Sequence, residues 1–164
     1  MKASLYALTT ALVVAAAAPV ALSAASEDEA AIRQTCNAFV AGWNQHDARA
    51  MAATFAEDGD LINPFGAQAQ GRAGVEKFFA EEQAKVMGGT TYRITEMKVR
   101  MLSPTLATSD WTSSVTGLKN PDGAAQPPFI HHVFVVLDKA NGQWLAKSVR
   151  AFAFVPPPGP PPHA

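Results

Sequence analysis

The sequence predicts one α+β domain, in which a curved, cone-shaped antiparallel β-sheet wraps three N-terminal helices. Two observations predict this class. Apolar residues recur at helical spacing in three segments between residues 26 and 88. Segments with the composition and alternation of strands then follow between residues 91 and 154. The roughly 130 residues involved are enough for a single hydrophobic core with a cavity.

The first helix is predicted to begin at Ser26, which forms a capping box with Glu29. Its apolar stripe comprises Ile32, Cys36, Phe39, Val40 and Trp43. Cys36 is the only cysteine, so no intramolecular disulfide can form. We interpret it as a buried thiol of the stripe, with a nucleophile or an intermolecular disulfide as alternatives.

Two further helices and a short strand are predicted next. Asp47 is a suitable N-cap for a short helix that buries Met51 and Phe55. Residues 57–60 have the composition of a turn, and a strand follows over residues 61–63. The third helix opens at residue 71 and ends at the Gly88–Gly89 pair.

Four strands are predicted over residues 91–102, 106–116, 129–137 and 143–154. In the first of these, Met97, Val99 and Met101 share one face, and Lys98 and Arg100 share the other. The intervening loop over residues 117–128 is rich in Gly, Pro, Asn and Asp. A turn over residues 138–142 pairs the last two strands, so we expect a run of antiparallel neighbours.

The two ends of the chain differ from the domain. Residues 1–25 combine Lys2, an apolar run and small residues, which is typical of a secretory signal peptide. We therefore expect an exported protein, periplasmic or secreted, with an uncleaved membrane anchor as the alternative. The Pro-rich residues 155–164 are predicted to form a disordered, exposed tail, with a docking peptide as the alternative.

Charge and motifs exclude several classes. The formal net charge of -1 argues against a nucleic-acid partner. We expect no metal site, because the sequence has no HExxH or CxxC motif. We also expect no cofactor, because it has no dinucleotide-binding fingerprint. No membrane partner is expected once the leader has been removed.

Several of these features together resemble the nuclear transport factor 2-like superfamily and, within it, the SnoaL-like and SgcJ/EcaC groups. The matching residues are Trp43–Asn44, Asp47, Phe55, Asp58–Gly59, Gly71–Arg72 and Gly142–Gln143–Trp144, and the resemblance spans residues 26–154. It implies a cone with a small-molecule pocket, often in a homodimer. The function that it implies is proton-transfer chemistry of the isomerase, dehydratase or cyclase type, or else a non-catalytic ligand-binding or dimerisation module.

Four residues are candidates for proton transfer: Asp60, Asp110, His131 and His132. Adjacent residues of a strand point to opposite faces, so at most one histidine can enter a pocket, and periodicity does not choose between them. The alternative for both is a structural or interface role. An apolar cavity would raise the pKa of Asp60, with a solvated turn as the alternative. Asp110 alternates with Trp111, so only one of that pair faces inward.

The remaining candidates would bind the ligand. Arg150 shares a predicted face with Trp144 and Phe152 and could hold an oxyanion, with a salt bridge to Asp60 or Asp110 as the alternative. The candidates for the pocket wall are Trp43, Phe55, Asn63, Phe78, Trp111 and Phe152. Aromatic residues such as Trp43, Phe55, Phe78 and Trp111 belong more often to the core than to a pocket wall, which is the alternative for these four.

Overall fold

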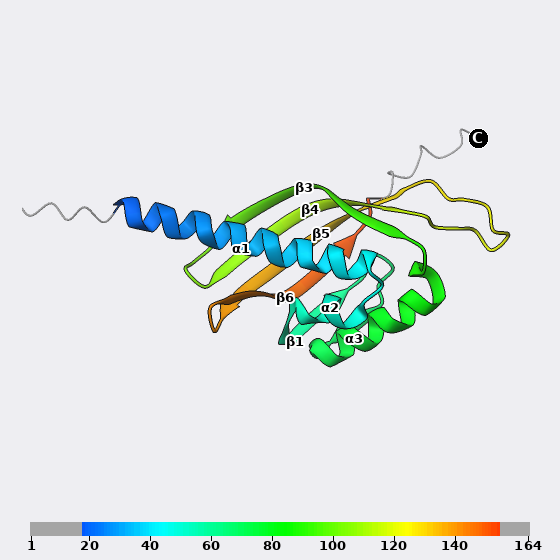
Figure 1. Cartoon of the computed structure of the whole chain (residues 1–164), viewed down its shortest axis with the longest axis horizontal. Coiled ribbons are helices and arrows are strands. Elements are labelled where there is room, and N and C mark those ends of the chain that lie inside the picture. The colour runs from blue at the N-terminus through cyan, green and yellow to red at the C-terminus, as the bar shows by residue number, and fades with distance from the viewer. Residues whose placement is uncertain (1–17, 155–164) are drawn as a thin grey trace, which may run out of the picture.

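A computed structural model describes residues 18–154 of the chain, with side chains from Ser26 onward (Figure 1). Six strands form one curved sheet in the order β2-β1-β6-β5-β4-β3. β1 and β6 run parallel, and the other neighbouring pairs are antiparallel. The α+β class and the curved sheet are confirmed. The elements are α1 (Ala18–Asn44), α2 (Ala48–Ala53), β1 (Phe55–Ile62), β2 (Gln68–Gln70), α3 (Gly71–Glu82), a π-helical turn (Gln83–Met87), β3 (Thr91–Met101), β4 (Leu106–Thr116), β5 (Phe129–Ala140) and β6 (Gln143–Phe152).

The helices cover one face of the sheet. Figure 1 shows α1 lying along the strands, with α2 and α3 packed together near its C-terminal end. The predicted apolar stripe of α1 is the part that faces the sheet, and Ile32, Cys36 and Trp43 are buried. The space between α1 and the concave face of the sheet therefore holds the core.

The helix starts were predicted with mixed success. The prediction that Ser26 caps α1 is wrong, because the helix is continuous from Ala18. The Ala-rich sequence before Ser26 has a high helix propensity, which extends the helix upstream. The predicted N-cap of α2 is confirmed: the Asp47 side chain accepts a hydrogen bond from the Ala50 amide at 2.9 Å.

The first strand begins earlier than the sequence indicated. Residues 57–60 were predicted as a turn, but they lie inside β1, which starts at Phe55. Phe55 is buried as expected, although it belongs to the strand rather than to α2. The register of β1 against β6 is irregular between Phe55 and Asp60, so the strand carries extra residues there. This bulge accommodates the turn-like sequence without ending the strand.

Two more irregularities decide which side chains face the core. In β3, Ile94 and Glu96 pair with consecutive residues of β4, so Thr95 is an extra residue. In β6, Lys147 is extra in the same way. Each extra residue reverses the inward and outward alternation of the strand beyond it.

The predicted signal peptide reaches only partly into the described residues, and the Pro-rich tail lies outside them. α1 runs through the predicted boundary between residues 25 and 26. Within residues 18–154, no helix has both the length and the apolar character needed to cross a membrane.

Candidate functional site

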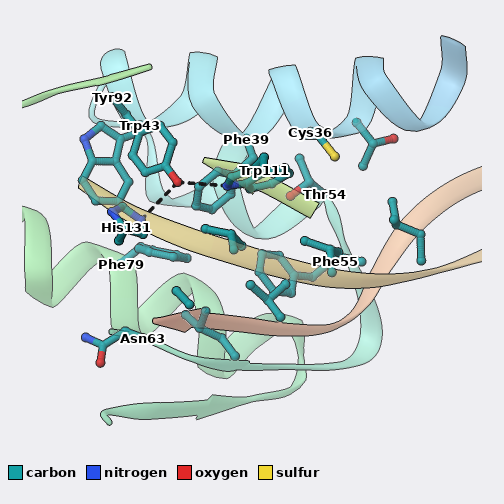
Figure 2. Close-up of a pocket in the computed structure, with 18 of the residues that line it drawn as sticks. Cys36, Phe39, Trp43, Thr54, Phe55, Asn63, Phe79, Tyr92, Trp111 and His131 are labelled. Carbon is teal, nitrogen blue, oxygen red and sulfur yellow. Dashed lines mark hydrogen bonds between the residues drawn. The ribbon is translucent and has the colours of Figure 1, made fainter. Parts of the chain in front are cut away.

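An apolar cavity lies between α1 and the concave face of the sheet (Figure 2). Its volume is about 70 Å³, which is small beside the roughly 300–1,000 Å³ of typical ligand pockets. The helices supply one side of its wall and β1, β3, β4, β5 and β6 supply the other. The lining residues are Thr35, Cys36, Phe39, Trp43, Thr54, Phe55, Leu61, Asn63, Pro64, Phe79, Tyr92, Trp111, His131, Val133, Val135, Leu137, Ala146, Val149 and Ala151.

Neutral polar groups gather at one end of this cavity. The Trp111 indole donates to Tyr92 Oη at 3.2 Å, and Oη lies 3.2 Å from His131 Nε2 (Figure 2). Ser113 Oγ is 3.1 Å from the same Nε2 and donates to the main-chain oxygen of His131, also at 3.1 Å. Three strands, β3, β4 and β5, therefore meet in one buried network.

His131 brings the most unusual atom to this network. Its side chain is 5% exposed, and Nδ1 is buried without a hydrogen-bond partner among the described residues. Burial, assisted by the nearby charge of His132, lowers the pKa of His131 to about 4. At neutral pH the ring is therefore uncharged, with Nε2 hydrogen-bonded and Nδ1 buried without a partner among the described residues.

Two further groups in the cavity are also held neutral. Burial raises the pKa of Tyr92 to about 12, although hydrogen bonds with Ser113 and Trp111 oppose the shift. Burial likewise raises the pKa of Cys36 to about 12, with the Ser109 hydroxyl opposing it. The thiol is thus protonated and buried, as predicted for a structural cysteine.

The structure brings five of the predicted site residues to the cavity: Trp43, Phe55, Asn63, Trp111 and His131. Trp43 is fixed by an indole hydrogen bond to the Thr90 hydroxyl at 3.0 Å. Asn63 contributes less than expected, because its side-chain oxygen already accepts from the amides of Phe65 and Ala67, at 3.0 and 2.8 Å. It therefore shapes the loop after β1.

Asp60 and Arg150 lie outside the cavity, paired with each other. Arg150 Nη2 is 2.5 Å from Asp60 Oδ2, which is the salt bridge weighed as an alternative from the sequence. Partial burial acts to raise the pKa of Asp60, but hydrogen bonds from Arg150 and Ser148 outweigh it and lower the pKa. The expected upward shift is therefore wrong, and neither residue lines the cavity.

The other four predicted residues also lie away from the cavity. Asp110 is exposed, because Trp111 is the inward member of that pair. His132 points to the outer face, where its ring stacks on Phe152 at a centroid distance of 5.8 Å and Nδ1 lies 3.3 Å from Thr112 Oγ1. Phe78 is half-buried on α3, where its ring contacts that of Phe79.

Sequence reasoning missed Tyr92, Ser113 and Phe79. Simple alternation along β3 would place Tyr92 and Met97 on opposite faces of the sheet. Because Thr95 is an extra residue between them, both side chains face the core. The signal for Ser113 was available, since it lies two residues after Trp111 on an unbroken strand. Phe79 was recognised as part of the helical stripe but not as a wall of the pocket.

No charged side chain lines the cavity within the described part of the chain. Residues 18–154 also contain no cluster of three or more His, Cys, Asp or Glu side chains that could hold a metal ion. The arrangement can therefore bind an uncharged molecule and exchange hydrogen bonds with it through His131 and Tyr92.

Comparisons with known proteins agree with this architecture. Residues 36–146 match the SnoaL-like domain family. An uncharacterised protein with a cystatin-like fold from Caulobacter vibrioides is similar in structure, with a TM-score of 0.71, 19% identity and coverage of 79% of this chain and 92% of that chain. No curated protein matches the sequence significantly.

Two other similar structures carry functional descriptions. A candidate scytalone dehydratase from Novosphingobium aromaticivorans has a TM-score of 0.68 and 18% identity, with 87% of this chain and 99% of that chain covered. A ketosteroid isomerase-like protein from Erwinia carotovora atroseptica has a TM-score of 0.65 and 23% identity, with 77% and 96% covered. At these identities the similarity shows a shared nuclear transport factor 2-like fold.

Proposed function

Because this chain belongs to the SnoaL-like domain family, we propose that its cavity binds a small, uncharged, largely apolar molecule with a hydroxyl or carbonyl oxygen. The observation that carries the proposal is the buried Nδ1 of His131, which has no partner among the described residues. An unpartnered buried polar atom costs about 1–3 kcal/mol. A ligand oxygen that bonds to Nδ1 would remove that cost.

The hydrogen-bond network indicates how a ligand would be held. Ser113 donates its single proton to the main-chain oxygen of His131, so it can only accept from Nε2. With Ser113 donating to the main-chain oxygen, we place the ring proton on Nε2 and a lone pair on Nδ1. Trp111 donates to Tyr92 Oη, and the single Nε2 proton is shared between Ser113 Oγ and Tyr92 Oη, so the phenol proton can turn toward a ligand or toward Ser113. A ligand hydroxyl can donate to His131 and accept from Tyr92.

The same pair supports proton transfer of the isomerase or dehydratase type. Nδ1 would take a proton from the carbon beside a carbonyl while the Tyr92 hydroxyl hydrogen-bonds to the developing oxyanion. The descriptions of the two similar structures support this chemistry. The second candidate is a binding module without catalysis. It is favoured by the low pKa of His131, which makes the ring a weak base.

Ligands that share one ring but differ in charge test the binding proposal. Cyclopentanol, cyclopentanone and cyclopentanecarboxylate would be titrated at neutral pH, and binding followed by the fluorescence of Trp43 and Trp111. We expect the alcohol and ketone to bind at least about tenfold more tightly than the carboxylate, because no cation lines the cavity. Equal or tighter binding of the carboxylate would contradict the proposal.

Hydrogen exchange separates the two candidate functions. The protein would be incubated with cyclopentanone in deuterated water, and loss of the hydrogens beside the carbonyl followed by proton NMR. Catalysis predicts faster exchange than in buffer, and no acceleration by a His131→Phe variant. Binding without exchange by the unaltered protein would favour the non-catalytic module.

We also propose that the protein is exported and forms a homodimer. Export is supported by the leader-like composition of residues 1–25. Dimerisation is supported by the frequent occurrence of homodimers in the superfamily. It is also supported by three exposed apolar side chains, Ile130 on β5, Phe152 on β6 and Phe154 just after β6. N-terminal sequencing and light scattering of protein purified from its own host test both. An intact leader or a monomer would contradict them.

A further inference from the structure

We infer that the ligand-binding site continues from the cavity into a surface groove beside α1, and that the ligand is a linear, uncharged alkyl compound with its oxygen at the His131 end. The inference rests on the proposed function and specifies the ligand class. Its observations are the two neighbouring spaces, the residues they share, and the small volume of the cavity alone.

The groove lies where α1 and α2 meet the turn between β5 and β6. It offers about 550 Å³, compared with about 70 Å³ in the cavity. Its lining is uncharged, and much of it consists of alanine side chains, with two glutamines. The lining residues are Ala31, Gln34, Thr35, Ala38, Ala50, Ala53, Thr54, Gly142, Gln143, Trp144 and Leu145.

Thr35 and Thr54 line both spaces, so one layer of side chains separates the cavity from the groove. Their hydroxyls are already engaged with the main chain. Thr35 Oγ1 donates to the Trp144 oxygen at 2.8 Å, and Thr54 Oγ1 donates to the Met51 oxygen at 2.7 Å. A hydrocarbon chain that passes between these residues would therefore leave no new unsatisfied hydroxyl.

The cavity has a direction that suits a ligand polar at one end. Figure 2 shows Tyr92 and His131 together at one end, with Cys36 and Thr54 farther along the cavity. Two buried side-chain atoms lack a hydrogen-bond partner among the described residues, Ser109 Oγ and His131 Nδ1, and only His131 lines the cavity, at the first end. An oxygen bound there would direct the rest of the molecule past apolar walls toward the threonines.

The two volumes indicate why such a ligand needs the groove. A cavity of about 70 Å³ accommodates only a few heavy atoms, well below the size of typical ligand pockets. The groove supplies the missing space without supplying charge, since its polar side chains are amides and hydroxyls. An ionised tail would find no counter-charge in the lining of the groove, so we expect the tail to be apolar or neutral.

A series of linear primary alcohols from butanol to decanol tests the inference by calorimetric titration. For the unaltered protein, affinity should rise about threefold to fourfold with each added methylene throughout the series. The Ala38→Trp variant fills the groove from an exposed position on α1. Its affinity for butanol should be unchanged, but its affinity should stop rising once the cavity is full.

Two more variants make the result specific. Ala53→Trp fills the same groove from α2 and should give the same plateau as Ala38→Trp. Ala80→Trp is the matched control, because Ala80 is exposed on α3 and lines neither space. It should follow the unaltered protein across the whole series.

The outcomes distinguish this inference from the proposed function. If the groove variants follow the unaltered protein through decanol, the groove does not hold the chain and the inference is overturned. An early plateau in the unaltered protein overturns it as well, while binding of the short alcohols leaves the proposed function standing. If no alcohol binds at all, the proposed function fails together with the inference.

Discussion

The two faces of the sheet carry opposite kinds of polarity. The inner face presents His131, Tyr92 and Ser113, all uncharged and joined by hydrogen bonds. The outer face presents ions in pairs, Arg150 with Asp60 and Lys147 with Asp58. The two charged candidates Asp60 and Arg150 are therefore paired with each other outside the cavity. The hydrogen-bonding capacity inside suits a neutral ligand.

The adjacent histidines show the contrast within two residues. His131 is buried, and its Nδ1 has no hydrogen-bond partner among the described residues. His132 is half-buried and contacts Thr112, Phe152 and Phe154. Residue type alone gives both the same capacity for acid–base chemistry. The face of the strand is what places His131, and not His132, in the lining of the cavity.

The largest expected difference between the faces concerns stability. Phe55→Ala removes a fully buried ring and should lower the free energy of unfolding by about 3–5 kcal/mol. Phe152→Ala removes a ring that is 41% exposed on the outer face, and should cost about 1 kcal/mol or less. Urea unfolding measures both. Similar costs for the two variants would contradict the assignment of the core to the inner face.

The next effect is a pH dependence caused by His131. Its folded pKa of about 4 lies below the ordinary value of 6.5, so the unfolded chain binds this proton more readily between those values. Stability from this group is fully present above pH 6.5 and is lost as the pH falls toward 4. The whole loss should be about 3 kcal/mol.

Unfolding measurements between pH 4.5 and 6.5 isolate this contribution. The pKa values of Asp28, Asp58 and Asp60 are lowered from 3.8, so these residues lose their stabilising effect only at more acidic pH. His131→Phe should remove most of the slope in this range. An unchanged slope in that variant would show that His131 is not the group responsible.

The smallest effect is expected for the outer ion pair. Asp60→Asn leaves Arg150 without its carboxylate partner, and because both side chains are partly exposed the cost should be about 1 kcal/mol or less. Binding of cyclopentanol should not change, since Asp60 does not line the cavity. A loss of binding beyond about threefold would place Asp60 in the site after all.

Helical spacing and turn chemistry predicted the fold well. The stripe of α1, the Asp47 cap and the four long strands all follow from local sequence signals. The start of β1 was missed because residues 57–60 combine turn-forming composition with a bulged strand. Gly59 illustrates the reason. A Cβ at this position would lie 2.7 Å from the main-chain oxygen of Ala146, so glycine is needed here for the close approach of β1 to β6 rather than for a turn.

The candidate site was predicted less well, for two physical reasons. Alternation shows that His131 and His132 face opposite ways, but only the curvature of the sheet and the position of α1 decide which face is inside. The extra residues Lys147 and Thr95 then reverse the alternation within β6 and β3. They moved Arg150 outward and Tyr92 inward, and no local signal marks either bulge.

We propose that His131, and not the adjacent His132, holds an uncharged ligand on the inner face of the sheet. The most direct measurement is a titration of cyclopentanol into the matched variants His131→Phe and His132→Phe, with the fold of each checked by circular dichroism. We expect cyclopentanol to bind at least about tenfold more weakly to His131→Phe, and with unchanged affinity to His132→Phe. Equal affinities in the two variants, or a loss confined to His132→Phe, would contradict it.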